Sequence, residues 1–134
     1  MPSTAYREGE RLEKLTGIFR GLANLDRLRI VYLLAMSDRP LCVCEIVDAL
    51  DLPQYQVSKH LRTLARLDLI STRRDGRWSY CSLAETEGVR RLTAFLLQAL
   101  PEGGMSEEIR RLHERLALRR GGRCTLEARK ANRA

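Results

Sequence analysis

Four cysteines carry the most distinctive chemistry of this 134-residue chain, and two of them, Cys42 and Cys44, lie one residue apart. Thiolates bind soft ions, and a pair this close offers two sulfur ligands from one short segment. Directly downstream, from Pro53 to Leu69, the chain becomes a basic helical stretch suited to a DNA groove. A distortion at the two cysteines would therefore move the DNA-reading segment.

The spacing of the pair sets a geometric condition on ion binding. In an α-helix successive residues turn by about 100°, so the side chains of Cys42 and Cys44 would point about 200° apart. Two thiolates in that register cannot share one ion. We therefore expect an ion held by this pair to melt or bend the start of the helix over residues 42–50, and so to weaken the DNA contact.

The nature of the ion follows from the donors available. Structural zinc takes four ligands, and a single Cys-x-Cys pair is a weak zinc signal. A soft ion that accepts three thiolates suits the chain better, and trivalent arsenic or antimony is the natural candidate. Cys124 lies in a Gly-Gly-Arg-Cys segment, where Arg123 favours the thiolate form. It is either the third ligand, from its own or a partner subunit, or an incidental cysteine, whereas Cys81 is interpreted as a small buried apolar residue.

Composition restricts the partners. The chain has 24 Lys and Arg residues against 17 Asp and Glu, a net charge of +7, which favours phosphate groups as binding partners. Aromatic residues make up 5%, which argues against stacking on single-stranded bases. No apolar run reaches the roughly 18 residues of a membrane span, and the first residues lack the apolar core of a secretion signal. We expect a cytoplasmic protein with thiols instead of disulfides.

Apolar periodicity predicts the elements that position these residues. Helices are expected over residues 7–22, 24–36, 42–50, 53–67, 86–100 and 105–119. Two strand-like runs, 69–74 and 77–83, flank Asp75-Gly76, a strong hairpin signal. Two helices joined by a tight turn and followed by a hairpin predict a mainly α fold with a small β-hairpin, the winged helix-turn-helix.

The second helix of such a motif reads bases with its N-terminal part, which here is polar and basic. Glutamine pairs with adenine, and lysine and arginine contact phosphate or guanine. Arginines on the hairpin suit phosphates or the adjacent minor groove. His60 is either a packing residue or a phosphate contact. The candidate DNA-binding residues are Gln54, Tyr55, Gln56, Ser58, Lys59, His60, Arg62, Arg73, Arg74 and Arg77.

A single winged unit makes few phosphate contacts, so useful affinity favours a homodimer on double-stranded DNA. The first and fifth predicted helices carry more apolar surface than so small a core can absorb, and we assign them to the dimer interface. The alternatives are that they close their own subunit's core, and that the basic face is only solvated. Residues 1–119 would form the DNA-binding and dimerisation domain. Residues 120–134 would form a basic tail, free to be disordered until something holds it.

Several segments resemble the ArsR/SmtB family of metal-responsive repressors, most closely its arsenical-sensing branch. They are Ala23-Asn24-Leu25-Asp26-Arg27-Leu28-Arg29-Ile30, Leu41-Cys42-Val43-Cys44-Glu45, Gln56-Val57-Ser58-Lys59-His60-Leu61 and Asp75-Gly76-Arg77-Trp78, continuing to Leu83. The resemblance implies a homodimeric winged-helix repressor that leaves its operator when arsenite or antimonite binds. It places Cys42 and Cys44 on the family's Cys-Val-Cys ligand pair and implies no required cofactor beyond the inducer, As(III) or Sb(III).

The chain also departs from the family pattern. The arsenical branch often has a third cysteine three residues after the pair, and that position is Val47 here. Cys124, Cys81, a small thiol or hydroxide would have to complete the ligand set. The zinc-type site of the other branch, with acids and histidines on the fifth helix, is absent because residues 86–100 contain no histidine.

Two functional hypotheses remain. The leading one is a repressor induced by arsenite or antimonite. The alternative is a winged-helix repressor that responds to reversible oxidation of its thiols. An enzyme is not expected, because the sequence has no Cys-x-x-Cys pair, no histidine placed to activate a thiol and no nucleotide-binding loop.

Overall fold

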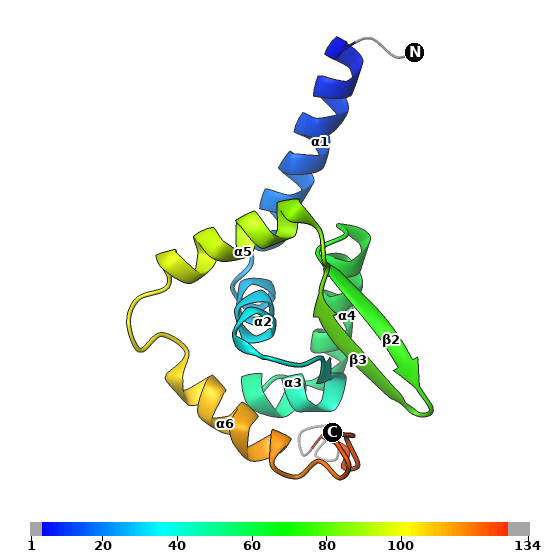
Figure 1. The fold of residues 1–134 in the computed structure, drawn as a ribbon, viewed down its shortest axis with the longest axis vertical. Helices are drawn as coiled ribbons and strands as arrows, with labels where there is room; N and C mark the ends of the chain where they lie inside the picture. Colours follow the sequence, from blue (N-terminus) through cyan, green and yellow to red (C-terminus); the bar gives the residue numbers. More distant parts are fainter. Residues whose placement is uncertain (1–3, 129–134) are drawn as a thin grey trace.

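A computed structural model describes residues 4–128 of the chain, and its side chains from residue 8 onward. The elements, in chain order, are α1 (Thr4–Leu22), α2 (Leu25–Met36), β1 (Leu41–Cys42), α3 (Val43–Leu50), α4 (Gln54–Arg66), β2 (Ile70–Asp75), β3 (Trp78–Leu83), α5 (Glu87–Ala99) and α6 (Ser106–Leu116). Helices α3 and α4 form the helix-turn-helix, and the β2–β3 hairpin forms the wing (Figure 1). The predicted winged helix-turn-helix is therefore confirmed. No helix in the described part is long and apolar enough to cross a membrane.

The helix-turn-helix follows from local sequence signals. Asp51 ends α3 in the left-handed conformation, with φ 56°, and Pro53 is the N-cap of α4, one position earlier than the first-turn place expected for it. The fixed φ of proline suits the start of a helix. Proline also lacks the N–H group that would need a hydrogen-bond partner there. Val57, Leu61 and Leu64 lie one turn apart on α4 and are buried against the core, which leaves the polar face of α4 outward.

The sheet contains a strand that the periodicity did not predict. Its order is β1-β3-β2, and all neighbours are antiparallel. The short strand β1 pairs Cys42 with Tyr80 of β3. In the wing, Asp75 pairs with Trp78, so the loop is only two residues long, and Gly76 takes a positive φ of 61° that suits glycine. Strand β1 thus anchors the first cysteine to the base of the wing.

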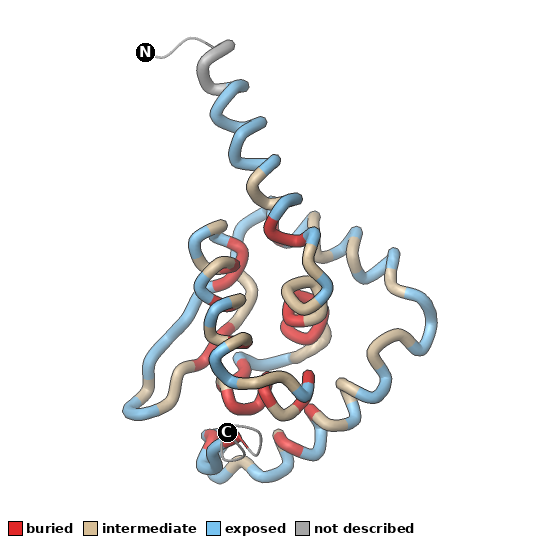
Figure 2. Tube along the Cα trace, turned by 180° about the vertical axis from the view of Figure 1, so that it is seen from behind, coloured by how far each residue is buried: buried red, intermediate tan, exposed pale blue. Residues whose placement is uncertain are grey.

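The core lies between α2, α3, α4 and the base of the sheet, where buried positions concentrate (Figure 2). Helix α6 and residues 117–128, which we call the C-terminal strap, cover the outer side of α3 (Figure 1). Cys124 is 2% exposed and Ala128 is fully buried. Residues 120–128 are therefore held by packing and do not form a free tail, while residues 129–134 of the predicted tail lie outside the described residues.

Candidate thiol site and DNA-binding surface

Three thiols meet between the start of α3 and the C-terminal strap. The Sγ atom of Cys44 lies 3.3 Å from that of Cys42 and 3.1 Å from that of Cys124. All three sulfurs lie within 4.8 Å of one another, and all three residues are buried. Two sulfurs each about 2.3 Å from a shared ion are themselves separated by about 3–4 Å. The spacing of this three-thiol cluster therefore suits a single ion held by three sulfurs.

The sulfurs of Cys42 and Cys44 lie close together although α3 is intact. The melting expected for the third helix assumed that both residues are helical, and that assumption is wrong. Cys42 is the N-cap of α3 and has an extended backbone, with φ −71° and ψ 147°. Cys44 lies inside the first helical turn. The helical angle of about 200° applies only when both residues are helical. The extended N-cap turns the Cys42 side chain toward Cys44 while α3 stays intact.

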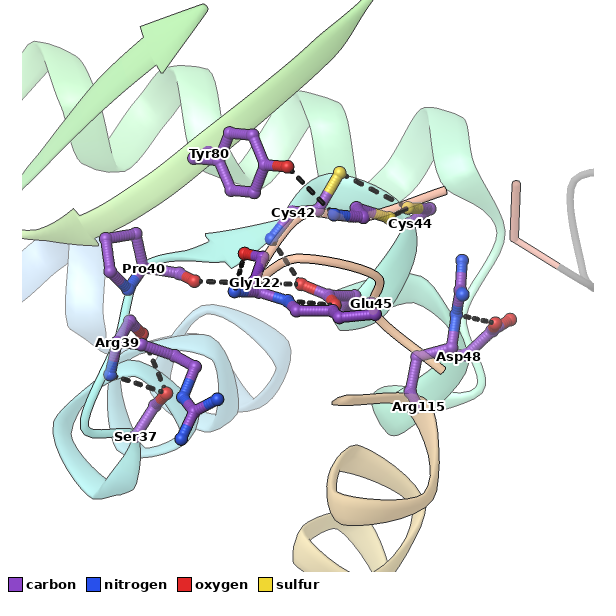
Figure 3. A network of polar contacts seen from close by, with 12 residues as sticks. Ser37, Arg39, Pro40, Cys42, Cys44, Glu45, Asp48, Tyr80, Arg115 and Gly122 are labelled. Atoms are coloured by element: carbon purple, nitrogen blue, oxygen red, sulfur yellow. Dashed lines mark hydrogen bonds and ion pairs between the residues drawn. The ribbon is translucent and has the colours of Figure 1, made fainter. Parts of the chain in front are cut away.

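A buried ion pair fixes the start of α3 (Figure 3). The backbone N–H of Cys42 donates a hydrogen bond of 2.8 Å to the Glu45 carboxylate, in the manner of a capping box. Glu45 is fully buried, and Arg119 of the strap donates to its two oxygens over 2.8 and 2.6 Å. The same guanidinium donates to the carbonyl of Pro40 over 2.8 Å. The strap is therefore fastened to the segment that carries the cysteine pair.

Cys124 is held by its own set of contacts. Its backbone N–H donates a hydrogen bond of 3.0 Å to the Tyr80 hydroxyl on β3. Two residues further on, the carbonyl of Leu126 accepts a hydrogen bond from Arg115, which also donates over 2.8 Å to Asp48 of α3. These contacts place the Cys124 sulfur beside Cys44 of the same chain. Of the two subunit origins open for the third sulfur, this geometry supports its own subunit.

The thiols differ in protonation. The pKa of Cys42 is lowered to about 6, chiefly because the Cys44 thiol donates a hydrogen bond to its sulfur. The same contact raises the pKa of Cys44, and burial raises that of Cys124. Burial also raises the pKa of Cys81 to about 12. Cys42 is thus the thiol of the cluster that ionises most readily, and the raised pKa of Cys81 agrees with its interpretation as a small buried apolar residue.

Most of the predicted DNA-binding residues are exposed, but Arg73 lies apart from Arg74 and Arg77, beside Tyr80 and Arg119. Gln54, Tyr55, Lys59 and Arg62 on α4 are exposed, as are Arg73, Arg74 and Arg77 on the wing, while Gln56 and Ser58 are half-buried. A groove of about 700 Å³ between α4 and the wing is lined by Ser58, Arg62 and Arg77 and extends to Cys42 and Cys44. Several of the predicted reading residues and two of the thiols therefore line the same groove.

His60 differs from the rest of this set. Its Nδ1 atom is buried and has no hydrogen-bond partner among the described residues. Burial, together with the charge of Arg27, lowers the pKa of His60. Of the two roles left open for this residue, the geometry supports packing more than phosphate contact.

Several residues of the site escaped the sequence reasoning, namely Glu45, Asp48, Tyr80, Arg115 and Arg119. Glu45 had a local signal, because an acid three residues after an N-cap is typical of a capping box. The others act through contacts between residues far apart in the chain, such as Arg119 with Glu45. No local pattern indicates such contacts.

Fold and surface together define a winged-helix regulator that binds DNA. Residues 25–72 match the model of the bacterial regulatory protein, arsR family. An uncharacterized HTH-type transcriptional regulator of Methanocaldococcus jannaschii is 37% identical over 71 residues, 53% of this chain and 79% of that protein. The arsenical resistance operon repressor of Bacillus subtilis is 34% identical over 80 residues, 60% of this chain and 75% of that protein. The chain belongs to the ArsR family of transcriptional repressors, which are DNA-binding regulators and not enzymes.

Two further comparisons bear on the ligand and the assembly. The cadmium resistance regulatory protein CadC of Listeria innocua is 35% identical over 66 residues, 49% of this chain and 55% of that protein. The homodimeric winged helix-turn-helix domain of a possible ArsR-family regulator from Mycobacterium bovis superimposes with a TM-score of 0.63 at 29% identity. The match covers 74% of this chain and 89% of that domain. Relatives named for arsenic and for cadmium thus occur at similar identity.

Proposed function

We propose that this repressor releases its operator when arsenite or antimonite binds Cys42, Cys44 and Cys124. The observation that carries the proposal is the buried three-thiol cluster. The Cys44 sulfur lies 3.3 Å from that of Cys42 and 3.1 Å from that of Cys124. Its relatives include repressors named for arsenical resistance, which agrees with such an inducer. The protein would act in the cytoplasm, where its operator DNA lies.

Charge favours a trivalent metalloid over a divalent metal. Arsenous acid exchanges its three hydroxyl groups for three sulfurs and releases three molecules of water. Two of the protons come from the thiols and the third comes from solvent where Cys42 is a thiolate, so the bound product is uncharged. A divalent cation with three thiolates keeps a net charge of −1 and lacks a fourth ligand. Within the described residues, the group of candidate ligands around Cys44 contains three sulfurs and no fourth donor. Burying an uncompensated charge is costly, so the neutral complex fits this site better.

The proposed assembly is a homodimer on double-stranded operator DNA. Leu12, Leu15 and Phe19 on α1 and Phe95 on α5 are exposed, at 65%, 48%, 58% and 65%. Apolar side chains this exposed on two helices are typical of a surface that a partner covers. The homodimeric relative from Mycobacterium bovis supports the same arrangement. The exposed residues of α4 and the wing would then face two half-sites of the operator.

The proposal is tested by operator binding of serine variants in the presence of arsenite. Fluorescence anisotropy of labelled operator DNA would follow Cys42→Ser, Cys44→Ser and Cys124→Ser, with Cys81→Ala as the control outside the cluster. All four variants are expected to bind the operator, and only Cys81→Ala is expected to release it with arsenite as the wild type does. Release that persists in the three serine variants would reject the site. Release by Cd²⁺ at lower concentrations than arsenite would reject the inducer.

A redox repressor is the second candidate, and one distance favours it. Cys44 and Cys124 are close enough, at 3.1 Å between sulfurs, to form a disulfide after a small movement. Hydrogen peroxide would oxidise the two thiols to one disulfide and be reduced to two molecules of water. Release of DNA by low peroxide, reversal by dithiothreitol and no response to arsenite would establish this function in place of the first.

A further inference from the structure

The C-terminal strap touches the wing at an arginine that belongs to the predicted DNA-binding surface. An Nη atom of Arg77 lies 2.5 Å from a carboxylate oxygen of Glu127. Arg77 stands in the two-residue loop at the wing tip, and its guanidinium also lies over the Trp78 ring, 4.6 Å from the centroid. A carboxylate and a phosphate oxygen use the same donors of an arginine. Glu127 therefore uses a donor of Arg77 that a DNA phosphate would also use if Arg77 contacts the operator as predicted.

Glu127 lies three residues from the third sulfur of the cluster. At one end of this segment the Cys124 backbone N–H donates a hydrogen bond to the Tyr80 hydroxyl, and between the ends the Leu126 carbonyl accepts one from Arg115. A second strap residue, Arg123, approaches Asp75 of the wing at 3.8 Å. The short segment from Cys124 to Glu127 thus spans the distance between the three-thiol cluster and the wing.

We propose that Glu127 competes with DNA phosphate for Arg77, and that a metalloid bonded to Cys124 strengthens this competition by fixing the strap in place. Glu127 acts here through Arg77 and does not itself contact the DNA. The second half of the proposal rests on the proposed function, whereas the first half concerns only Arg77 and Glu127.

The strength of the contact decides how the competition works. Both side chains are largely exposed, at 64% and 58%, and exposed ion pairs contribute little by themselves. DNA phosphates can therefore displace Glu127 while the strap is held by noncovalent contacts alone. When Cys124 shares an ion with Cys42 and Cys44, opening the strap would require a bond to the ion to break. Operator binding then carries a larger cost, and by linkage DNA must weaken metalloid binding by the same factor.

The test compares Glu127→Gln with Glu114→Gln in the full chain. Glu114 is an exposed α6 residue that pairs with Arg110, so its substitution removes the same charge away from the wing. Without metalloid, Glu127→Gln is expected to bind the operator more tightly at low salt. It should also lose more affinity than the control between 50 and 200 mM salt, by up to about threefold, because competition from Glu127 leaves the contact of Arg77 with phosphate only partly made in the wild type. With arsenite, Glu127→Gln should release the operator less completely, although three sulfurs still surround arsenic in X-ray absorption spectra.

The background variant Arg77→Gln sharpens the design. In that background Glu127→Gln should have no further effect on the salt dependence, because the competition for Arg77 is gone. Equal salt dependence and equal release in Glu127→Gln and Glu114→Gln would overturn the inference. The same holds if the effect of Glu127→Gln persists unchanged in the Arg77→Gln background.

The two proposals fail separately. If arsenite does not bind the wild type, the proposed function fails, while the measurements without metalloid still decide whether Glu127 competes for Arg77. If arsenite binds and releases the wild type but Glu127→Gln behaves as the control, only the strap inference fails.

Discussion

Arg119 forms a bidentate ion pair with the carboxylate of Glu45, with nitrogen to oxygen distances of 2.6 and 2.8 Å. The Glu45 side chain is fully buried. The pair joins the strap to the first turn of α3, beside Cys42 and Cys44. Removing one partner of a buried ion pair is strongly destabilising, so the segment that carries the cysteine pair depends on this contact.

Arg119→Met is expected to destabilise the protein by about 3–5 kcal/mol, because it leaves the Glu45 carboxylate buried without a counterion. Urea denaturation followed by circular dichroism would measure the change. Arg110→Met is the matched control, since Arg110 forms ion pairs with Glu107 and Glu114 on the exposed face of α6 and its loss should have little effect. Equal stability of the two variants would show that the buried pair is not needed.

Capture of arsenite should slow as the pH falls through about 6. The pKa of Cys42 is lowered to about 6, so its sulfur is a thiolate above that pH and a thiol below it. Only the thiolate is an effective nucleophile. Stopped-flow measurement of binding between pH 5 and 9 would give the profile. A rate that instead falls steadily from pH 9 to 7, as for an ordinary cysteine, would contradict the assignment of the thiolate to Cys42.

His60 should make the protein less stable in mild acid. Its pKa is lowered in the folded state, so the unfolded chain takes up the proton first as the pH falls below about 6.5. Stability is then fully present above that pH and declines below it. His60→Gln should flatten this decline in urea denaturation between pH 7.5 and 5, whereas His113→Gln, at an exposed position, should not. If His60→Gln instead leaves the pH profile unchanged and weakens operator binding, His60 contacts phosphate.

Phe95→Ser should weaken the homodimer without unfolding the subunit, because the Phe95 side chain is 65% exposed. Analytical ultracentrifugation would measure the dissociation, and operator affinity should fall with it. Tyr55→Ser is the control, since Tyr55 is an aromatic residue on α4 that is 71% exposed and is one of the predicted DNA-binding residues. It should weaken operator binding and leave the dimer intact. A dimer unaffected by Phe95→Ser would exclude this side chain from the interface.

Much of the fold could be predicted from the sequence, because apolar periodicity and turn residues are local signals. The helices and the wing were located this way, as was Cys81 as a buried thiol. Strand β1 escaped, since it is only two residues long and pairing with β3 is what defines it. The convergence of Cys42 and Cys44 was misjudged because periodicity cannot tell an N-cap from a first helical residue.

The position of the third sulfur, that of Cys124, could not be predicted from local sequence patterns. Cys124 lies 80 residues from Cys44 in the chain, and the contacts of Arg115, Arg119 and Tyr80 that hold it are all long-range. The Gly-Gly-Arg-Cys segment indicated a flexible end by composition. Burial against α3 overrides that tendency, and only the folded arrangement reveals it.

All the sulfurs of the cluster come from one chain. If the cluster holds the inducer as proposed, each protomer of a dimer would be a complete receptor, and occupancy of one would not wait for a contribution from the other. A mixed dimer of one intact and one Cys124→Ser protomer should take up half the arsenic of the wild type. It would also show whether one loaded half-site is enough to free the promoter.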